Sequence, residues 1–162
     1  MGDPAATFRA SRPPRIRLCE IGQPLPSSPR PLSRIARLPC DPHGVRRGLA
    51  TALLFAGDAA IGDSAADKLS IIVEEWLINV VEHGEAAPGR RIALGLERRG
   101  DVVRLSVSDP GLAFDPREQV FEGPNLERGG GAGLAMINAW SRIVAYRRRA
   151  GRNRLVLEMP IT

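Results

Sequence analysis

The sequence predicts an α+β two-layer sandwich, in which a mainly antiparallel, mixed β-sheet is covered on one face by about three helices. Two long stretches, 42–56 and 64–83, repeat apolar residues with the period of an amphipathic helix. Shorter stretches alternate apolar and polar residues in pairs joined by turn sequences, which is typical of antiparallel hairpins. Because these strands follow one another without an intervening helix, a doubly wound parallel sheet is not expected.

Length and composition favour one folded domain of a soluble, cytoplasmic protein. The chain has 162 residues, of which 43% are hydrophobic and 25% are charged. This is enough for a single hydrophobic core. No apolar run approaches the ~20 residues that a bilayer-spanning helix needs. Residues 1–6 contain no apolar segment of the kind that directs secretion.

Cysteine content and charge argue against metal and nucleic-acid sites. Cys19 and Cys40, with the distant His43 and His83, are too few and too scattered for a disulfide framework or a zinc site. The net charge is +5, but aromatic residues make up only 4% of the chain, so no platform for stacking bases is expected. Nucleic acid is therefore not an expected partner. The arginine run 147–149 is interpreted as a solvated strand end.

The first part of the chain, residues 1–32, is predicted to be a flexible arm. It is rich in proline and arginine, and each proline removes a backbone donor and restricts its neighbour. It carries five arginines against two acidic residues, Asp3 and Glu20, so it holds much of the net positive charge. The folded domain is therefore expected to span residues 33–162.

A short strand and a helix open the predicted domain. Residues 34–38 alternate as in a strand, which Pro39 ends. Asp41 followed by Pro42 is typical of a helix start, and this helix is expected to run to about Ala56. The residues expected on its buried face are Val45, Leu49, Ala52, Leu53 and Ala56.

A second helix is the longest predicted element. It is expected to be capped by Asp63 or Ser64 and to end at Gly84. Its apolar face consists of Leu69, Ile72, Val73, Trp76, Leu77 and Val80. Because successive residues turn by about 100°, Glu75, Asn79 and His83 form a polar stripe at the edge of that face. Polar groups beside a buried surface are costly to desolvate unless they have partners, so this stripe is a candidate site.

A hairpin and a long loop follow the second helix. Residues 92–96 and 103–107 alternate on either side of a turn at 99–101. The second of these strands runs directly into Asp109-Pro110-Gly111. No period covers residues 112–131, and a loop of this length in a compact domain is typically functional or disordered.

The chain ends with a short helix and a second hairpin. The helix is expected from Gly133 to about Ser141. Residues 143–146 and 154–160 are then expected to pair around a turn at 150–153.

Three local motifs suit a nucleotide. On the second helix, Asn79 offers a neutral oxygen for Mg²⁺, which keeps water and phosphate as most of its ligands. At the strand exit, Asp109 can accept a hydrogen bond from an exocyclic amine such as that of adenine, and Gly111 lets the backbone approach the ring. In the glycine-rich third motif, backbone amides of residues 131–134 can hold phosphate oxygens at a helix start. Glu75 is placed to activate a hydroxyl or water near the terminal phosphate.

In this order and spacing, the motifs resemble the Bergerat-type ATP-binding domain of histidine kinases, type II topoisomerases and their relatives. The short form is similar to the bacterial anti-sigma-factor serine/threonine kinases, and the resemblance covers about residue 33 to the C-terminus. It implies a Bergerat fold, ATP and Mg²⁺, Glu75 as catalytic base and Asn79 as Mg²⁺ ligand. The residues that it implies around ATP are Asn79, Asp109, Gly111, Phe114, Gly131, Gly133 and Leu134.

The resemblance implies a regulator of transcription. Such a kinase binds a sigma factor and phosphorylates a serine of a small STAS-type antagonist, which then fails to release the sigma factor. Relatives commonly form homodimers, and the loop 115–130 is expected to be a lid over the phosphates. A histidine kinase fragment is not expected, because residues 1–32 contain no histidine.

One departure from the family pattern keeps an alternative open. Many relatives carry an arginine inside the glycine-rich motif, where this chain has Gly130 and Ala132, and the nearest arginine is Arg128. A catalytically weak, ATP-dependent protein-interaction switch of the same fold is therefore the second hypothesis.

Overall fold

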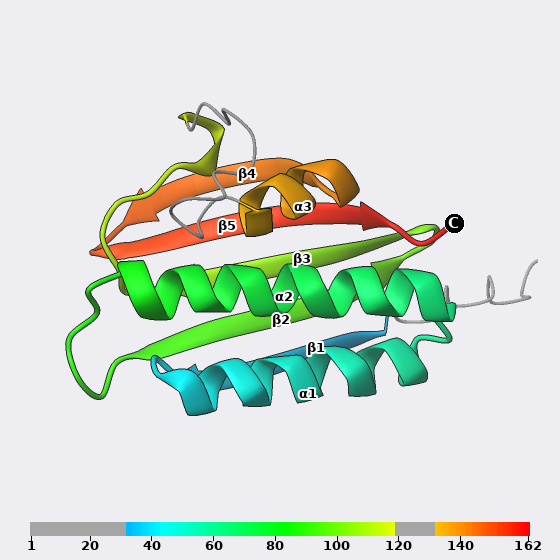
Figure 1. Cartoon of the computed structure of the whole chain (residues 1–162), viewed down its shortest axis with the longest axis horizontal. Helices are drawn as coiled ribbons and strands as arrows, with labels where there is room; N and C mark the ends of the chain where they lie inside the picture. The colour runs from blue at the N-terminus through cyan, green and yellow to red at the C-terminus, as the bar shows by residue number, and fades with distance from the viewer. Residues whose placement is uncertain (1–31, 119–131) are drawn as a thin grey trace, which may run out of the picture. The chain divides into compact units, whose positions relative to one another are not determined.

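The structure, a computed structural model, describes residues 32–118 and 132–162. The predicted arm, apart from Leu32, and the greater part of the predicted lid lie outside the described residues. The elements, in chain order (Figure 1), are β1 (Ser33–Pro39), α1 (Pro42–Asp58), α2 (Asp63–His83), β2 (Arg91–Arg99), β3 (Val102–Asp109), the 3-10 helix η1 (Pro116–Glu118), α3 (Ala132–Trp140), β4 (Arg142–Arg149) and β5 (Arg152–Pro160).

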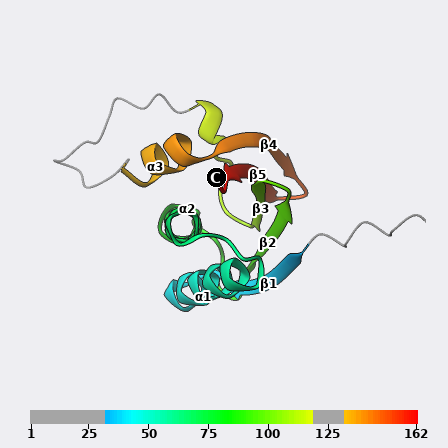
Figure 2. The same ribbon diagram turned by 90° about the vertical axis from the view of Figure 1, so that its right-hand side faces the viewer.

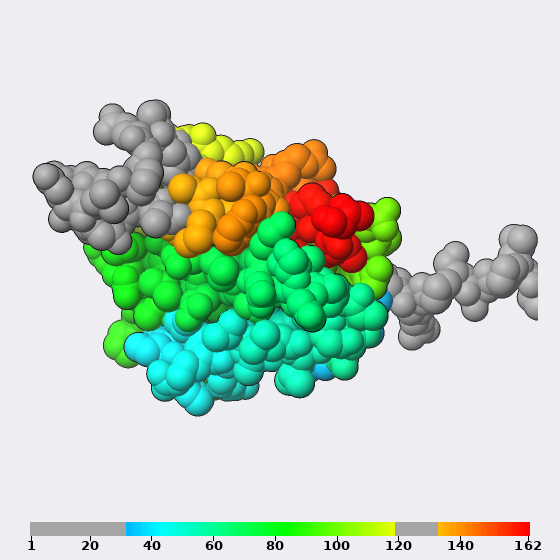
Figure 3. Space-filling model, turned by 45° about the vertical axis from the view of Figure 1, so that its right-hand side comes forward, coloured from blue at the N-terminus to red at the C-terminus, as the bar shows by residue number. Residues whose placement is uncertain are grey.

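The predicted α+β sandwich is confirmed. The five strands form one sheet in the order β1-β2-β3-β5-β4, and every neighbouring pair is antiparallel, so the sheet is not mixed. Figure 2 shows the sheet edge-on, with all three α-helices on one side of it. On the helical face, α2 lies between α1 and α3 (Figure 3). No helix within the described ranges is long and apolar enough to cross a membrane.

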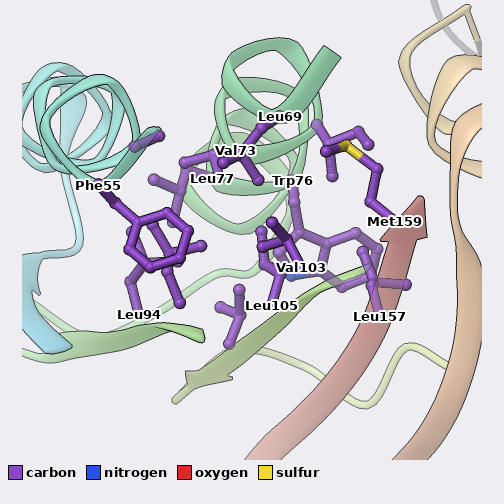
Figure 4. Packing of buried hydrophobic residues seen from close by; sticks show 14 of the residues in the cluster. Phe55, Leu69, Val73, Trp76, Leu77, Leu94, Val103, Leu105, Leu157 and Met159 are labelled. Carbon is purple, nitrogen blue, oxygen red and sulfur yellow. The ribbon is translucent and has the colours of Figure 1, made fainter. Parts of the chain in front are cut away.

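The hydrophobic core lies between the helices and the inner face of the sheet. Every second residue of β3 and β5, and of β2 as far as Leu96, is buried, as the alternation in the sequence predicts. Figure 4 shows Phe55 of α1 and Leu77 of α2 pointing toward the sheet residues Leu94 and Leu105. Each such side chain contributes roughly 1.5–3 kcal/mol to folding through burial.

Helix α1 begins as predicted but turns a different face to the core. Asp41 is the N-cap, and its Oδ1 accepts a hydrogen bond of 2.9 Å from the Gly44 amide. The predicted core residue Leu53 is 53% exposed, whereas Phe55 is completely buried. Gly48 allows the close approach of the two helices, because a Cβ there would overlap Leu77.

The ends of α2 differ from prediction in their chemistry. Neither Asp63 nor Ser64 caps the helix, because the N-cap is Gly62, which has no side chain to do so. The helix ends at Gly84 as predicted, but this glycine has φ of −76° and is not in the left-handed region. Glycine is needed here for steric reasons and not for its backbone conformation, because a Cβ would overlap the Val80 carbonyl oxygen.

The last hairpin is tighter than predicted. Its turn consists of Ala150 and Gly151, with φ of 50° and 70°. Two consecutive residues with positive φ are typical of a type I′ turn, whose twist matches that of the flanking strands. Arg152 and Asn153, predicted in the turn, therefore belong to β5.

Leu77→Ala is expected to lower the free energy of unfolding by about 2–5 kcal/mol, because it opens a cavity beneath α2. Leu77 is completely buried between the helices and the sheet. Leu53→Ala, the same change at a 53% exposed side chain, is expected to stay within about 0.5 kcal/mol. Urea denaturation of both variants measures the difference. Equal losses would contradict the observed orientation of α1.

Candidate functional site

A cavity of about 360 Å³ lies between the C-terminal half of α2, the segment after β3, the start of α3 and the first residues of β5. Its apolar walls include Trp76, Val80, Leu112, Phe114 and Leu134. Its polar lining consists of Asn79, His83, Asp109 and Asn153. A mostly apolar cavity with few polar groups is typical of a small-molecule site.

The predicted site residues gather at this cavity. Asn79, Asp109, Phe114 and Leu134 line it. Of the remaining predicted residues within the described ranges, Gly111 contacts Asp109 in the cavity wall, and Gly133 contacts Glu75. Gly131 lies outside the described residues.

Asp109 is held so that one carboxylate oxygen stays available. The residue is only 3% exposed and stands at the end of β3. Its Oδ1 accepts two hydrogen bonds of 2.9 Å, from the Gly111 amide and from Asn153 Nδ2. No hydrogen bond among the described residues uses Oδ2. This oxygen can therefore accept a donor from a molecule in the cavity that Asp109 lines.

Gly111 joins the floor of the cavity to the end of α2. A Cβ at Gly111 would lie within 3.0 Å of both the Gly84 backbone and Asp109 Oδ1, which is closer than van der Waals contact allows. The Leu112 amide also donates a hydrogen bond of 2.8 Å to the Gly84 carbonyl oxygen. The two glycines thus let the loop after β3 lie directly against α2, which fixes one edge of the cavity.

Asn153 is the centre of a hydrogen-bond network beneath the cavity. Its Nδ2 donates to Asp109 Oδ1 at 2.9 Å and to the Leu112 carbonyl at 2.7 Å. Its Oδ1 accepts from Tyr146 Oη at 2.9 Å and from Arg148 at 2.8 Å. All the hydrogen-bonding capacity of this 5% exposed carboxamide is therefore used, so it holds Asp109 in one orientation.

The same network reaches both sides of the loop after β3. Tyr146 Oη accepts a hydrogen bond of 3.0 Å from the Phe114 amide. Arg148 donates to the Gly111 carbonyl oxygen at 2.8 Å. Arg147, Arg148 and Arg149 are all exposed at the end of β4, as predicted, but Arg148 also donates hydrogen bonds to this network.

The sequence interpretation missed Asn153, Tyr146 and Arg148. The alternation of β5 contained a signal for the first of them. Leu155, Leu157 and Met159 are buried at every second position, and counting back two residues places Asn153 on the same inner face. It pairs in register with Asp109 on β3. A polar residue at an inner position of each of two neighbouring strands predicts a polar contact between them.

Glu75 lies beside the first turn of α3. A Cβ at Gly133 would overlap the Glu75 carboxylate, so a larger residue there would displace the Glu75 side chain. Burial raises the pKa of Glu75, and the nearby carboxylates of Glu74 and Glu82 raise it further. A carboxylate that holds its proton more tightly than an exposed one is better suited to accept a proton from a hydroxyl group.

The polar stripe on α2 runs along the cavity. Asn79 is half-buried, and His83, one turn later, is exposed at the rim. Trp76 forms the adjoining wall and packs against Phe114, with ring centroids 6.2 Å apart and planes tilted by 43°. Asn79 therefore lies between the apolar wall formed by Trp76 and Phe114 and the turn of α2 that carries Glu75.

The arrangement fits a flat ring that carries an amine and an attached charged group. Apolar walls can enclose the ring, and Asp109 Oδ2 can accept from the amine. Asn79 lines the cavity. Glu75, one helical turn before it on α2, lies against Gly133 at the start of α3. The half-buried carboxamide of Asn79 suits Mg²⁺, which takes few ligands from a protein when phosphates are present.

Comparison with solved structures found the following matches. The RsbU and RsbW domains of Rv1364c from Mycobacterium tuberculosis match with 22% identity and a TM-score of 0.57, over 80% of this chain and 32% of that one. The Acinetobacter baumannii histidine kinase AdeS matches with 13% identity and a TM-score of 0.45, over 80% and 68% of the two chains. The blue-light activated histidine kinase of Erythrobacter litoralis EL346 matches through its histidine kinase domain, with 15% identity and a TM-score of 0.43, over 76% and 61%.

These likenesses concern the fold, and this chain spans only 32% of the length of the Rv1364c structure. No curated protein sequence matches the chain. The family model of the histidine kinase-like ATPase domain matches residues 38–159, which contain every element from α1 to β4, most of β5 and the whole cavity. The chain therefore belongs to the histidine kinase-like ATPase domain family.

Proposed function

We propose that the protein is an ATP-dependent serine/threonine protein kinase that regulates a sigma factor. The observation that carries this proposal is that no described residue hydrogen-bonds to Oδ2 of buried Asp109 in an apolar cavity, with Glu75 beside the first turn of α3. The first feature supports recognition of adenine, and the second supports transfer of a phosphate.

Adenine is bound between the apolar walls of the cavity. Asp109 Oδ2 accepts a hydrogen bond from the exocyclic amine, while Gly111 and Asn153 keep the carboxylate in place through Oδ1. Phe114 and Leu134, which line the cavity, enclose the ring. Guanine has a carbonyl oxygen in place of the amine, so a carboxylate oxygen disfavours it.

The phosphates lie toward α3. Backbone amides in the first turn of α3, which includes Gly133, favour negative charge there. Asn79 would hold Mg²⁺ through its carboxamide oxygen, and the ion would supply positive charge beside the phosphates. Gly131, which the family pattern also assigns to this region, is part of the same proposal.

Glu75 acts as the general base. It accepts the proton of a serine hydroxyl on the substrate protein as the hydroxyl oxygen attacks the terminal phosphorus of ATP, and ADP leaves. Its raised pKa, caused first by burial, supports this role. Glu74 points about 100° away on the helix, so it is not proposed as the base.

The partners follow from the resemblance to anti-sigma kinases. We infer a sigma factor as the bound target and a STAS-type antagonist as the phosphorylated substrate. A homodimer and a cytoplasmic location belong to the same proposal. The fold shared with a structure that contains an RsbW domain is compatible with it.

A catalytically weak interaction switch is the second candidate function. Gly130 and Ala132 occupy the places where many relatives carry an arginine, and an arginine there would stabilise charge on the transferred phosphate. The retained Glu75 favours the kinase, because a switch that only binds ATP has no need of a base.

The kinase proposal predicts transfer of labelled terminal phosphate from ATP to a serine of a STAS-type protein from the same organism. Wild-type protein with Mg²⁺ is expected to label that substrate, and the substrate's serine-to-alanine variant is expected to remain unlabelled. Nucleotide binding is measured separately by calorimetry. Binding of ATP without any labelling would favour the switch, whereas failure to bind ATP would reject both functions.

A further inference from the structure

The outer face of the sheet carries a cluster of arginines at one end. This face lies opposite the helices, and no described element covers it (Figure 2). Six arginines lie together on this face, at the end of the sheet that contains Asp109, as the alternation and register of the strands show. They are Arg37, Arg91, Arg147, Arg149, Arg152 and Arg154. None of them forms an ion pair with a described carboxylate.

The opposite end of the same face differs. Glu158 pairs with Arg104 at 2.6 Å and with Arg142 at 2.8 Å, and Arg99 pairs with Glu97 at 2.8 Å. Each of the outward-facing arginines there has a carboxylate beside it, whereas those of the six-arginine cluster have none in the part of the chain described. Like charges held close together repel one another unless an anion joins them, so the cluster is suited to an acidic ligand.

The cluster surrounds a hollow with a fixed wall. The hollow measures about 270 Å³ and is lined by Arg37, Arg91, Arg152, Ala93 and Ser108. Arg152 donates hydrogen bonds to Ser108 Oγ at 3.1 Å, to the Ser108 carbonyl at 2.7 Å and to the Arg91 carbonyl at 3.0 Å. Ala93 and Ser108 have small side chains, which leave room for an anion. Because hydrogen bonds already restrain the Arg152 guanidinium, this side chain loses less conformational entropy when an anion binds.

A neutral strip adjoins the cluster. Ile35, Gly95, Ser106, Val156 and Ala145 stand in one cross-strand row from β1 to β4. Ile35 is 79% exposed, and Val156 lies with it along a second shallow hollow that also includes Arg154. The row crosses four interstrand spacings of about 4.8 Å, which equals the length of roughly six extended residues.

We propose that this face binds a short acidic segment of a partner protein, with carboxylates on the six-arginine cluster and apolar side chains on the neutral strip. Nucleic acid would use the arginines but would place phosphates and sugars against Ile35 and Val156. No aromatic side chain occupies an outward position of the described strands, so bases find nothing to stack on.

Two other occupants fit less well. A second copy of this face would bring the same unpaired arginines toward each other. The chain's own residues 1–32 carry five arginines against two acidic residues, which is the wrong sign for the cluster. An acidic segment of another protein can place carboxylates on the six-arginine cluster and apolar side chains on the neutral strip.

This surface is separate from the cavity on the helical side. Ser108 and Arg152 face outward, while their neighbours Asp109 and Asn153 face the cavity. The inference does not rest on the proposed kinase activity, and both sites can be filled together. Saturating ATP is therefore expected to leave binding of the acidic segment in place.

The test uses the full chain and a fluorescent peptide of about eight alternating glutamates and leucines. We expect it to bind, more weakly with rising salt, and more tightly than a glutamate–serine peptide or a thymidine oligonucleotide of equal charge. Arg37→Gln, Arg91→Gln and Arg154→Gln together are expected to lower its affinity at least about tenfold. These side chains make no hydrogen bonds to described residues, so the fold is preserved, and thermal unfolding checks this.

The matched control removes the same charge from the helical side with Arg46→Gln, Arg47→Gln and Lys68→Gln. It is expected to keep the wild-type affinity. Equal weakening by the two triple variants would overturn the proposal in favour of net charge alone. Tighter binding of the oligonucleotide would overturn it in favour of nucleic acid, and displacement of the peptide by ATP would mean that the surface is not a separate site.

Discussion

Asp109→Asn is expected to weaken ATP binding by about 10- to 100-fold while the protein remains folded. Asn is nearly the same size, and its Oδ1 can still accept from Gly111 and Asn153, as the Asp109 carboxylate does at 2.9 Å. The Nδ2 of the asparagine, however, takes the place of Asp109 Oδ2, so a hydrogen-bond donor replaces the acceptor proposed for adenine. A lost hydrogen bond to a charged group corresponds to about 1.5–3 kcal/mol, and the donor now opposes the adenine amine.

The same substitution is expected to change the choice of base. An amide donor at position 109 can pair with the carbonyl oxygen of guanine, which the wild-type carboxylate repels. The ratio of ATP to GTP affinity should therefore fall in the variant. Calorimetric titration with both nucleotides measures it, and a purely structural role of Asp109 would weaken both equally.

Asp101→Asn provides the matched control for this experiment. Asp101 is an exposed carboxylate at the other end of the same hairpin, and its loss removes the same charge. It is expected to leave both affinities unchanged. An Asp109→Asn variant that binds ATP like wild type would show that the adenine amine does not meet this carboxylate.

Local patterns in the sequence predicted most of the fold. Alternation predicted the ends of β2 and β3 within three residues, and the pair Asp41-Pro42 correctly marked the start of α1. Asp109 could be identified because it directly follows an alternating strand and precedes a glycine. In each case the physical cause lies within a few neighbouring residues.

The errors arose where distant residues decide the structure. Leu53 and Phe55 are both apolar, and only packing against α2 and the sheet selects Phe55 for the core. Asn153 was placed in a turn because Gly-Arg-Asn is rich in turn formers, whereas the turn uses Ala150 with φ of 50°. Alanine disfavours positive φ, so no local rule confines the predicted turn 150–153 to Ala150 and Gly151.

The six-arginine cluster was equally hidden from the sequence. Its members come from β1, β2, β4 and β5, and only the register of the sheet brings them together. Glu75 and Gly133 likewise come from two helices separated by two strands and a long loop. The family pattern named both residues, but their direct contact required the packing of α3 against α2.

This contact makes Glu75→Gln the most informative change for catalysis. The variant is expected to lower the rate of phosphate transfer by about 10²- to 10⁴-fold, the usual contribution of a general base. ATP affinity is expected to stay within a few-fold of wild type, because Asp109 and the apolar walls are untouched. Single-turnover transfer from labelled ATP, with a separate binding titration, measures both quantities.

Glu74→Gln is the control, since it removes the same charge from the adjacent residue on another side of α2. It is expected to retain transfer and to lower the pKa of Glu75, because the Glu74 carboxylate raises that pKa in the wild type. The acid limb of the pH–rate profile reports this pKa, since transfer requires the deprotonated base. The limb should therefore move to lower pH in Glu74→Gln. Equal loss of transfer in the two variants would contradict the assignment of Glu75.

Stability provides the readout that separates a base from a structural residue. Burial raises the pKa of Glu75 in the folded protein, so the folded state binds this proton more tightly than the unfolded state. The charged carboxylate therefore destabilises the fold above that pKa, and the effect disappears below the pKa of the unfolded chain. Glu75→Gln should be at least as stable as wild type at pH 7, with a smaller difference in acid. A variant that unfolds more easily at pH 7 while losing transfer would instead show that the carboxylate holds α2 and α3 together.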